Sequence, residues 1–170
     1  MSYAEDTTAT FTDTLGTLEH VLSRAQAAGM EDSMLGVKLA DDMFPLETQV
    51  RIAVSQIILA LGRVCGTDIP LDEAPYATLD EVRARVAAVS AAVVAAKDAK
   101  WADAEDQIDF TLPNGMRFVM TAEEYVRDWT LPNLYFHVTM TYALLRREGL
   151  PLGKFDFMKH MARHARPSAD

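Results

Sequence analysis

Residues 131–151 read LPNLYFHVTMTYALLRREGLP and have the composition of a helix inside a bundle. Between Asp128 and Arg146 the only acidic or basic side chain is that of His137. The apolar residues of this segment would point to nearly every side of a helix, and a helix that is apolar all round is buried on several sides. We therefore expect a helix over about 132–147 that either lies centrally or faces a second subunit.

Three further helices are predicted from apolar residues spaced three and four apart, a spacing that places them on one face of a helix. Thr78 and Glu81 have the spacing of a capping box at the start of the third helix. Asp42 is a plausible cap for the second helix. The helices are expected over about 8–28, 42–65 and 79–96, with a short extra helix over 31–39.

A β-hairpin is predicted between the third and fourth helices. Asn114 and Gly115 separate two short alternating segments, 109–112 and 116–119, and Asn-Gly is typical of a tight hairpin turn. A second capping box then opens a short helix that ends at about Trp129. The predicted fold class is all-α: a four-helix bundle with a small β-hairpin inserted before the last helix.

The size of the chain predicts one domain. It has 170 residues, of which 49% are hydrophobic and 24% charged, a mix typical of a soluble globular protein. A chain of this length buries enough surface to be stable without a disulfide or a structural metal. We expect a single domain over 1–158, followed by a basic, flexible C-terminal tail over 159–170.

The charge argues against several classes of partner. The net charge is −9, whereas nucleic-acid binding and adhesion to anionic lipid both need an excess of Lys and Arg. The single cysteine, Cys65, excludes an internal disulfide framework. The N-terminal residues are acidic rather than apolar, so no secretory signal is expected, and no membrane span is expected either. A cytoplasmic location follows as an expectation.

His137 is the strongest candidate for chemistry. On a helical wheel it lies on the buried side, beside Asn133 and Thr141. One interpretation is a metal ligand or a proton-transfer group that lines the bundle interior. The other is a core or interface histidine whose ring nitrogens are satisfied by hydrogen bonds.

The other histidines are weaker candidates for chemistry than His137. His160 and His164 stand four residues apart, a spacing that can bind zinc if a third ligand is supplied. His20 is expected on the solvated side of the first helix.

Three segments carry a family resemblance: DMFPL at 42–46, LPNLYFH at 131–137 and PLGK at 151–154. Together the chain resembles, over about residues 8–158, a bacterial family of unknown function in the DinB/YfiT-like superfamily. The resemblance implies an up-down-down-up four-helix bundle that is often dimeric. It also implies, in active members, a divalent metal held by three histidines, with hydrolase-like chemistry or transfer of small thiols.

The implied metal set is incomplete in this chain. One histidine would come from the second helix and two, four residues apart, from the fourth. No histidine occurs over 44–65, and the positions four residues from His137 hold Asn133 and Thr141. No cofactor is therefore favoured, although a divalent metal stays possible.

The functional hypothesis is a bundle with an incomplete metal triad, forming a homodimer through the last helix. It would bind a small ligand or a partner in the interhelical cleft around His137. The candidate ligand-binding residues are His137, Asn133, Tyr135, Tyr142, Asp42 and Gln49. The alternatives are a divalent-metal-dependent hydrolase or thiol transferase, and a purely structural dimer. Whether the protein is an enzyme stays open.

Overall fold

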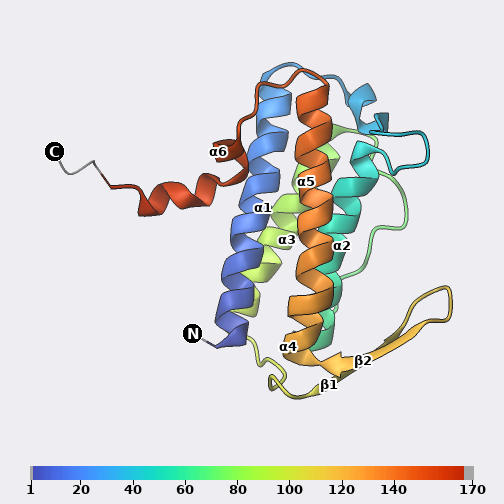
Figure 1. Ribbon diagram of the computed structural model, residues 1–170, viewed down its shortest axis with the longest axis vertical. Coiled ribbons are helices and arrows are strands. Elements are labelled where there is room, and N and C mark those ends of the chain that lie inside the picture. Colours follow the sequence, from blue (N-terminus) through green and yellow to red (C-terminus); the bar gives the residue numbers. More distant parts are fainter. Residues whose placement is uncertain (1, 167–170) are drawn as a thin grey trace.

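Four long helices form the body of the protein in a computed structural model that describes residues 2–166 (Figure 1). They are α1 (Tyr3–Ala27), α2 (Leu46–Cys65), α3 (Leu79–Ala96) and α5 (Leu131–Arg147). The helix α5 packs chiefly against α2, and α1 packs chiefly against α3. The predicted four-helix bundle is confirmed.

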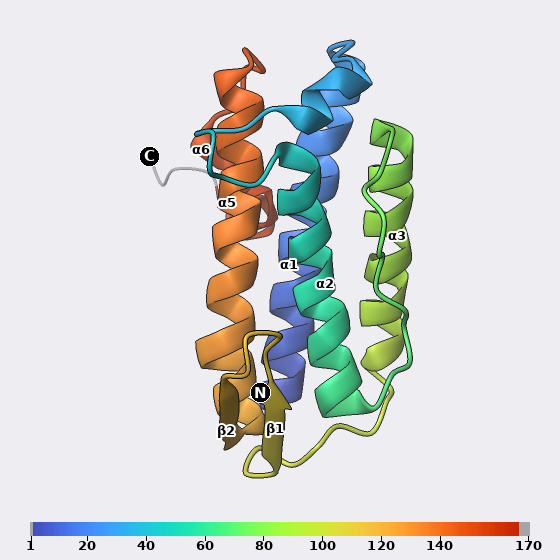
Figure 2. The ribbon, with the colours of Figure 1, turned by 90° about the vertical axis from the view of Figure 1, so that its right-hand side faces the viewer.

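The topology follows from one long connection. In Figure 2 the chain between α2 and α3 climbs back along the length of the bundle, so α2 and α3 run in the same direction. The order is therefore up-down-down-up, as the family resemblance implies. Glu47, a buried carboxylate in the first turn of α2, holds this connection by accepting a hydrogen bond from the backbone N–H of Tyr76 at 3.2 Å.

The helix starts follow local capping. The capping box of Thr78 and Glu81 opens α3 as predicted. The helix α1 begins five residues earlier than expected because Ser2 caps it together with Glu5. The expectation that Asp42 caps α2 is wrong. Pro45 is the N-cap and provides no side-chain hydrogen bond, and Asp42 lies in an exposed turn before it.

The hairpin consists of β1 (Gln107–Thr111) and β2 (Arg117–Thr121), which pair antiparallel. Gly115 adopts φ +86°, the left-handed conformation that its turn requires and that glycine adopts without strain. The guanidinium of Arg63 on α2 lies 4.4 Å from the ring centroid of Phe110 and donates to the hydroxyl of Tyr125, which fastens the hairpin to the end of the bundle.

The segment after the hairpin differs from the prediction. The expected short helix to Trp129 does not end there: α4 (Ala122–Glu124) continues through a π-helical turn (Tyr125–Thr130) into α5. Pro132 lies in the first turn of α5, where it has no N–H to donate, and the wide turn before it keeps the helix continuous. Asn133 Nδ2 donates to the carbonyl of Trp129 at 2.7 Å.

The helix α2 has the length and apolar composition to cross a membrane, judged on those two properties alone. Half of its most apolar window is buried inside the protein, where it packs against α5 and α3. Its apolar character is therefore accounted for by its place in the core.

Two residues of α5 are more exposed than its sequence predicts. The side chains of Tyr135 and Phe136 are 44% and 54% exposed, whereas His137 and Val138 are buried. These four consecutive residues therefore point to different surroundings.

After α5 the chain forms α6 (Lys154–Phe157) and a 3-10 turn (Lys159–His164), which contact α1 and then lead away from the bundle (Figure 1). Arg163 in this turn donates to both carboxylate oxygens of Asp13 at 2.7 Å. Of the predicted tail, residues 167–170 lie outside the described residues, and its flexibility stays a prediction.

Candidate functional site

A buried hydrogen bond joins α5 to α2 at the centre of the candidate site. His137 is 8% exposed, and its Nδ1 lies 2.7 Å from Oε1 of Gln49, which is 1% exposed. The inward orientation predicted for His137 is therefore observed. Gln49, which the sequence placed on the other helix, is its direct partner.

The hydrogen bonds of Gln49 fix the tautomer of His137. The Nε2 amide group of Gln49 donates to the carbonyl of Phe44 at 3.1 Å, so the amide oxygen faces the imidazole. An amide oxygen can only accept, so Nδ1 of His137 carries the proton and donates it. In the neutral ring, Nε2 then has a free lone pair. It makes no hydrogen bond with any of residues 2–166.

Burial keeps this imidazole neutral. Removal from water lowers the pKa of His137 from 6.5 to about 4, because the charged form loses its hydration. At neutral pH the ring therefore offers one acceptor nitrogen and no positive charge.

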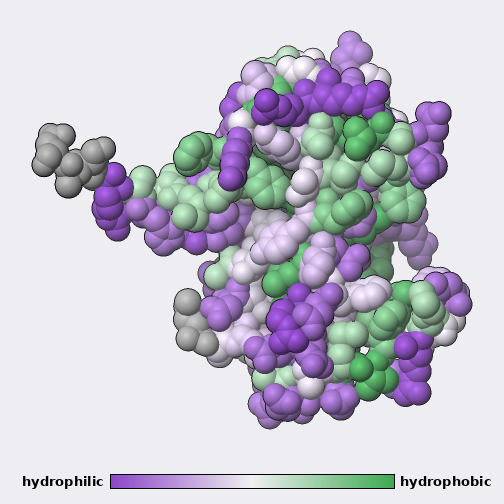
Figure 3. All heavy atoms as spheres, viewed as in Figure 1, coloured by the Kyte–Doolittle hydropathy of each residue, from purple (hydrophilic) through white to green (hydrophobic). Residues whose placement is uncertain are grey.

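One exposed aromatic side chain borders the pair. The ring of Phe136 meets the imidazole edge to face, with 5.2 Å between the ring centroids. Phe44, whose carbonyl binds Gln49, has its side chain 56% exposed. In Figure 3 the hydrophobic residues gather on the α2 side of this face, and the side toward α1 is more hydrophilic. The imidazole of His137 thus lies beside the exposed ring of Phe136.

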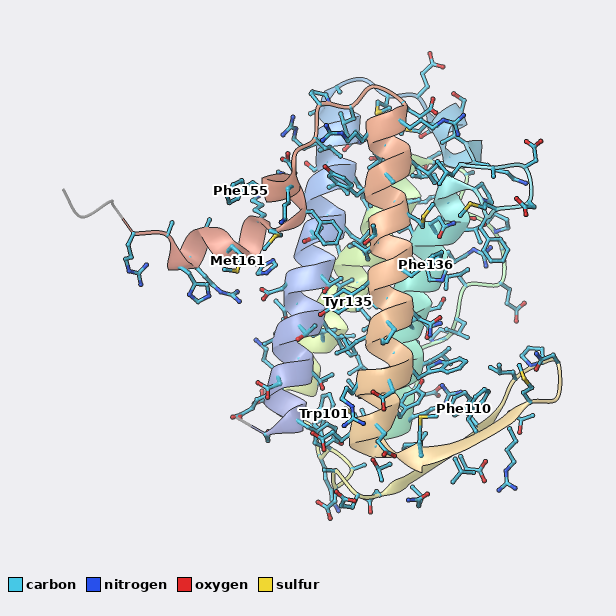
Figure 4. The ribbon with its side chains drawn as sticks, viewed as in Figure 1. Trp101, Phe110, Tyr135, Phe136, Phe155 and Met161 are labelled. Atoms are coloured by element: carbon cyan, nitrogen blue, oxygen red, sulfur yellow. The ribbon has the colours of Figure 1, made fainter. Side chains whose placement is uncertain are left out.

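The remaining predicted site residues lie elsewhere. Tyr135 and Phe136 project from opposite flanks of α5, with Tyr135 toward α1 (Figure 4). Tyr142 packs edge to face against Phe157, also on the α1 side. Asp42 is exposed in the turn before α2 and makes no side-chain hydrogen bond within the described chain. The structure therefore brings Gln49 to His137, and it separates Tyr135, Tyr142 and Asp42 from this pair.

The residues beside His137 do not complete a metal site. Among the described residues no group of three or more His, Cys, Asp or Glu side chains is close enough to hold a metal ion. Asn133 donates its amide to the carbonyl of Trp129, and Thr141 donates its hydroxyl to the carbonyl of His137 at 2.9 Å. A stable zinc site needs three or four ligands, and this one offers a single imidazole nitrogen. The donor set does not fit the implied metal.

The sequence missed two polar contacts of the C-terminal segment. His20, expected in solvent, is half-buried and its Nε2 lies 2.8 Å from Oδ1 of Asp156. Asp156 also accepts from the backbone N–H of Gly153 and from Arg24. The hydrogen bonds from Gly153 and His20, together with the charge of Arg24, lower the pKa of Asp156. No local pattern signals this cluster, because 136 residues separate the two partners.

His160 and His164 do not form the zinc pair that their spacing allows, since no third ligand joins them in the described part of the chain. His160 lies against α1 beside Asp13, and His164 is exposed next to Arg163. The 3-10 geometry of this turn also differs from the α-helix on which the four-residue spacing depends.

Comparisons with known proteins agree with the fold. A family model described as a domain of unknown function (DUF1993) matches residues 4–158. A crystal structure of a DinB family member protein from Shewanella denitrificans is similar, with 28% sequence identity and a TM-score of 0.72 over 96% of this chain and 92% of that one. A search of curated proteins finds no match.

Proposed function

The chain belongs to the DUF1993 family of unknown function, and on that basis we propose that it is a DinB-like binding protein without a metal. It binds a small ligand or a partner's polar group at the seam between α2 and α5, through Nε2 of His137. The single observation that carries the proposal is the fixed tautomer of this ring, which leaves Nε2 as an acceptor.

The chemistry of the seam defines what it can bind. A neutral imidazole nitrogen accepts a hydrogen bond from a hydroxyl or an N–H group, so the ligand must bring a donor. The exposed ring of Phe136 borders the imidazole and favours an apolar or aromatic body behind that donor. A phenol or an aromatic amide has both features.

A degenerate metal site is part of the proposal. The fold family implies three imidazole ligands, and this chain offers Gln49, Asn133 and Thr141 around one histidine. Gln49 uses its amide to hold the imidazole, as an outer-shell group holds a ligating histidine. A metal-dependent hydrolase or thiol transferase would instead require a stoichiometric metal. Metal analysis of untagged protein, alongside His137→Ala, separates the two functions.

The test of ligand binding combines a screen with two variants. Phenols, aromatic amides and alcohols are screened by thermal shift against the wild type, His137→Gln and His164→Gln. His164 is exposed, so its variant serves as the matched control. We expect at least one compound whose stabilisation is lost in His137→Gln and kept in His164→Gln. If no compound depends on His137, only the structural role of this residue is left.

A homodimer through α5 is also proposed, with a cytoplasmic location. Phe136 leaves an aromatic ring 54% exposed on α5, which supports burial against a second copy. Light scattering on the wild type and on Phe136→Asp tests the dimer: we expect a dimer that the substitution weakens. A strict monomer at high concentration would exclude both the proposed dimer and the purely structural alternative.

A further inference from the structure

A hollow lies on the side of α5 away from Phe136, between α5, α1 and the C-terminal segment. Its volume is about 150 Å³, and we call it the α1–α5 hollow. It is separate from the seam that holds His137 and Gln49. It is lined by Thr10, Asp13, Thr14, Thr17, Tyr135, Val138, Phe157 and His160.

The α1 wall of the hollow accepts hydrogen bonds. The hydroxyl of Thr14 donates to the carbonyl of Thr10 at 2.7 Å, and that of Thr17 donates to the carbonyl of Phe157 at 2.9 Å. Each hydroxyl has one proton, so both present lone pairs rather than donors to a ligand. The carboxylate of Asp13 can likewise only accept. A ligand that binds this wall must therefore supply N–H or O–H groups.

The opposite wall is aromatic and aliphatic. Tyr135 and Val138 come from α5, and Phe157 comes from α6. Burial and the charge of Asp13 together raise the pKa of Tyr135, which places that phenol in the field of the carboxylate. Aromatic faces attract cations, and a nearby carboxylate repels anions. The two walls together favour a positively charged donor with an apolar body.

One polar atom of the wall lacks a partner. Nδ1 of His160 is buried and makes no hydrogen bond with any described residue. This nitrogen is too well covered to be reached from the hollow, so the groups that a ligand can contact are those of Asp13, Tyr135 and Phe157.

We propose that the α1–α5 hollow binds a small organic amine in its ammonium form, with its N–H groups on Asp13 and its apolar part against Tyr135 and Phe157. A cavity of this size holds a molecule of about six to eight non-hydrogen atoms, since one of similar volume binds benzene. Asp13 already binds a cation, because Arg163 of the same chain donates to both of its oxygens. The ligand therefore competes with Arg163 for this carboxylate.

The site does not depend on the function proposed for the seam. His160 and Arg163 follow residue 158, where the match to the family model ends. The hollow and the seam share no residue, although every residue that lines the hollow except His160 lies within the family match.

Calorimetric titration of the full chain tests the proposal. The probe is benzylamine, with benzyl alcohol and benzoate as neutral and anionic molecules of nearly the same shape. We expect benzylamine to bind at least about tenfold more tightly than either, because a charge-assisted hydrogen bond is worth more than a neutral one. Equal binding of the amine and the alcohol, or no binding of the amine up to about 10 mM, would overturn the proposal.

Two substitutions at the ion pair should act in opposite directions. Asp13→Asn removes the carboxylate and should weaken benzylamine at least about tenfold. Arg163→Gln removes the competing cation and should tighten it. Asp41→Asn, at an exposed carboxylate far along the chain, is the matched control and should change nothing. If both ion-pair variants weaken binding equally, the ion pair supports the fold and the carboxylate holds no ligand.

A third variant keeps the test valid if Asp13→Asn unfolds. Thr14→Val has the same shape as threonine but removes the lone pairs facing the hollow. We expect about fivefold weaker binding of benzylamine, the effect of one hydrogen bond. Unchanged affinity in this variant would show that the amine makes no hydrogen bond with Thr14 and would contradict the placement of its N–H groups on this wall.

Discussion

Protonation of His137 is expected to destabilise the folded state. The imidazole is 8% exposed, and burial lowers its pKa to about 4, whereas the unfolded chain titrates near 6.5. Between these two values the unfolded state binds more protons than the folded state. The contribution of this group to the free energy of unfolding is therefore kept above pH 6.5. It is lost progressively as the pH falls from 6.5 toward 4.

The size of the effect follows from the gap between the two pKa values. One unit corresponds to about 1.4 kcal/mol, so a change from 6.5 to about 4 corresponds to about 3 kcal/mol. The hydrogen bond from Nδ1 to Gln49 exists in both protonation states. The loss therefore comes from placing a proton and a charge on Nε2, which has no partner among the described residues.

Urea unfolding at a series of pH values measures this loss. Carboxylates also titrate in the range, so the informative quantity is the difference between the wild type and His137→Gln, which does not titrate. We expect the wild type to lose about 3 kcal/mol relative to the variant between pH 7 and pH 4. His164→Gln, at an exposed position, should follow the wild type. Parallel curves for the wild type and His137→Gln would refute the reasoning, because His137 would then titrate as freely in the folded state as in the unfolded one.

Three other substitutions test the packing. Gln49→Leu leaves the buried Nδ1–H of His137 without an acceptor and should lower the free energy of unfolding in urea by about 1–3 kcal/mol. The double variant that also carries His137→Leu should recover part of this loss. Strictly additive losses would contradict the pairing of the two side chains. Arg63→Met removes the cation that lies against the rings of Phe110 and Tyr125. It should lower the free energy of unfolding by about 2 kcal/mol and speed proteolysis of the hairpin. An unchanged cleavage rate would show that Arg63 does not hold the hairpin to the bundle. Thr78→Ala should lower stability by about 1 kcal/mol in thermal unfolding through loss of the α3 cap, whereas Thr78→Ser should not.

The parts of the fold predicted correctly are those encoded by local sequence. The capping boxes opened by Thr78 and Thr121 and the turn at Gly115 each involve residues within about four positions, so the local pattern determines the structure. The apolar spacing then orients each helix. The wrong prediction for the start of α2 also has a local cause. Asp42 is a residue type that caps helices well, but the N-cap is Pro45, three residues later.

The candidate site could be predicted only in part. A polar residue such as His137 among apolar neighbours predicts burial, and Gln49 at the start of the facing helix is a reasonable partner. The side on which Tyr135 lies depends on how α5 is rotated against α1, and the sequence of α5 is apolar on too many sides to fix that rotation. The contacts of His20 and Arg163 depend on where the C-terminal segment returns to α1, and no periodic pattern encodes such a return.

The buried pair explains how this bundle can hold an imidazole in its core without an ion. A side chain at position 49 must satisfy two buried groups at once: the Nδ1–H of His137, which needs an acceptor, and the carbonyl of Phe44, which needs a donor. A glutamine amide has one acceptor oxygen and one donor NH2 group. A neutral histidine also has one acceptor and one donor nitrogen, but its ring would have to be turned so that the acceptor faces His137 and the donor faces the carbonyl of Phe44. Gln49 thus supplies the orientation that a metal-ligating histidine takes from its outer shell, and it leaves Nε2 without a hydrogen-bond partner among residues 2–166, which is the atom that the proposed ligand would use.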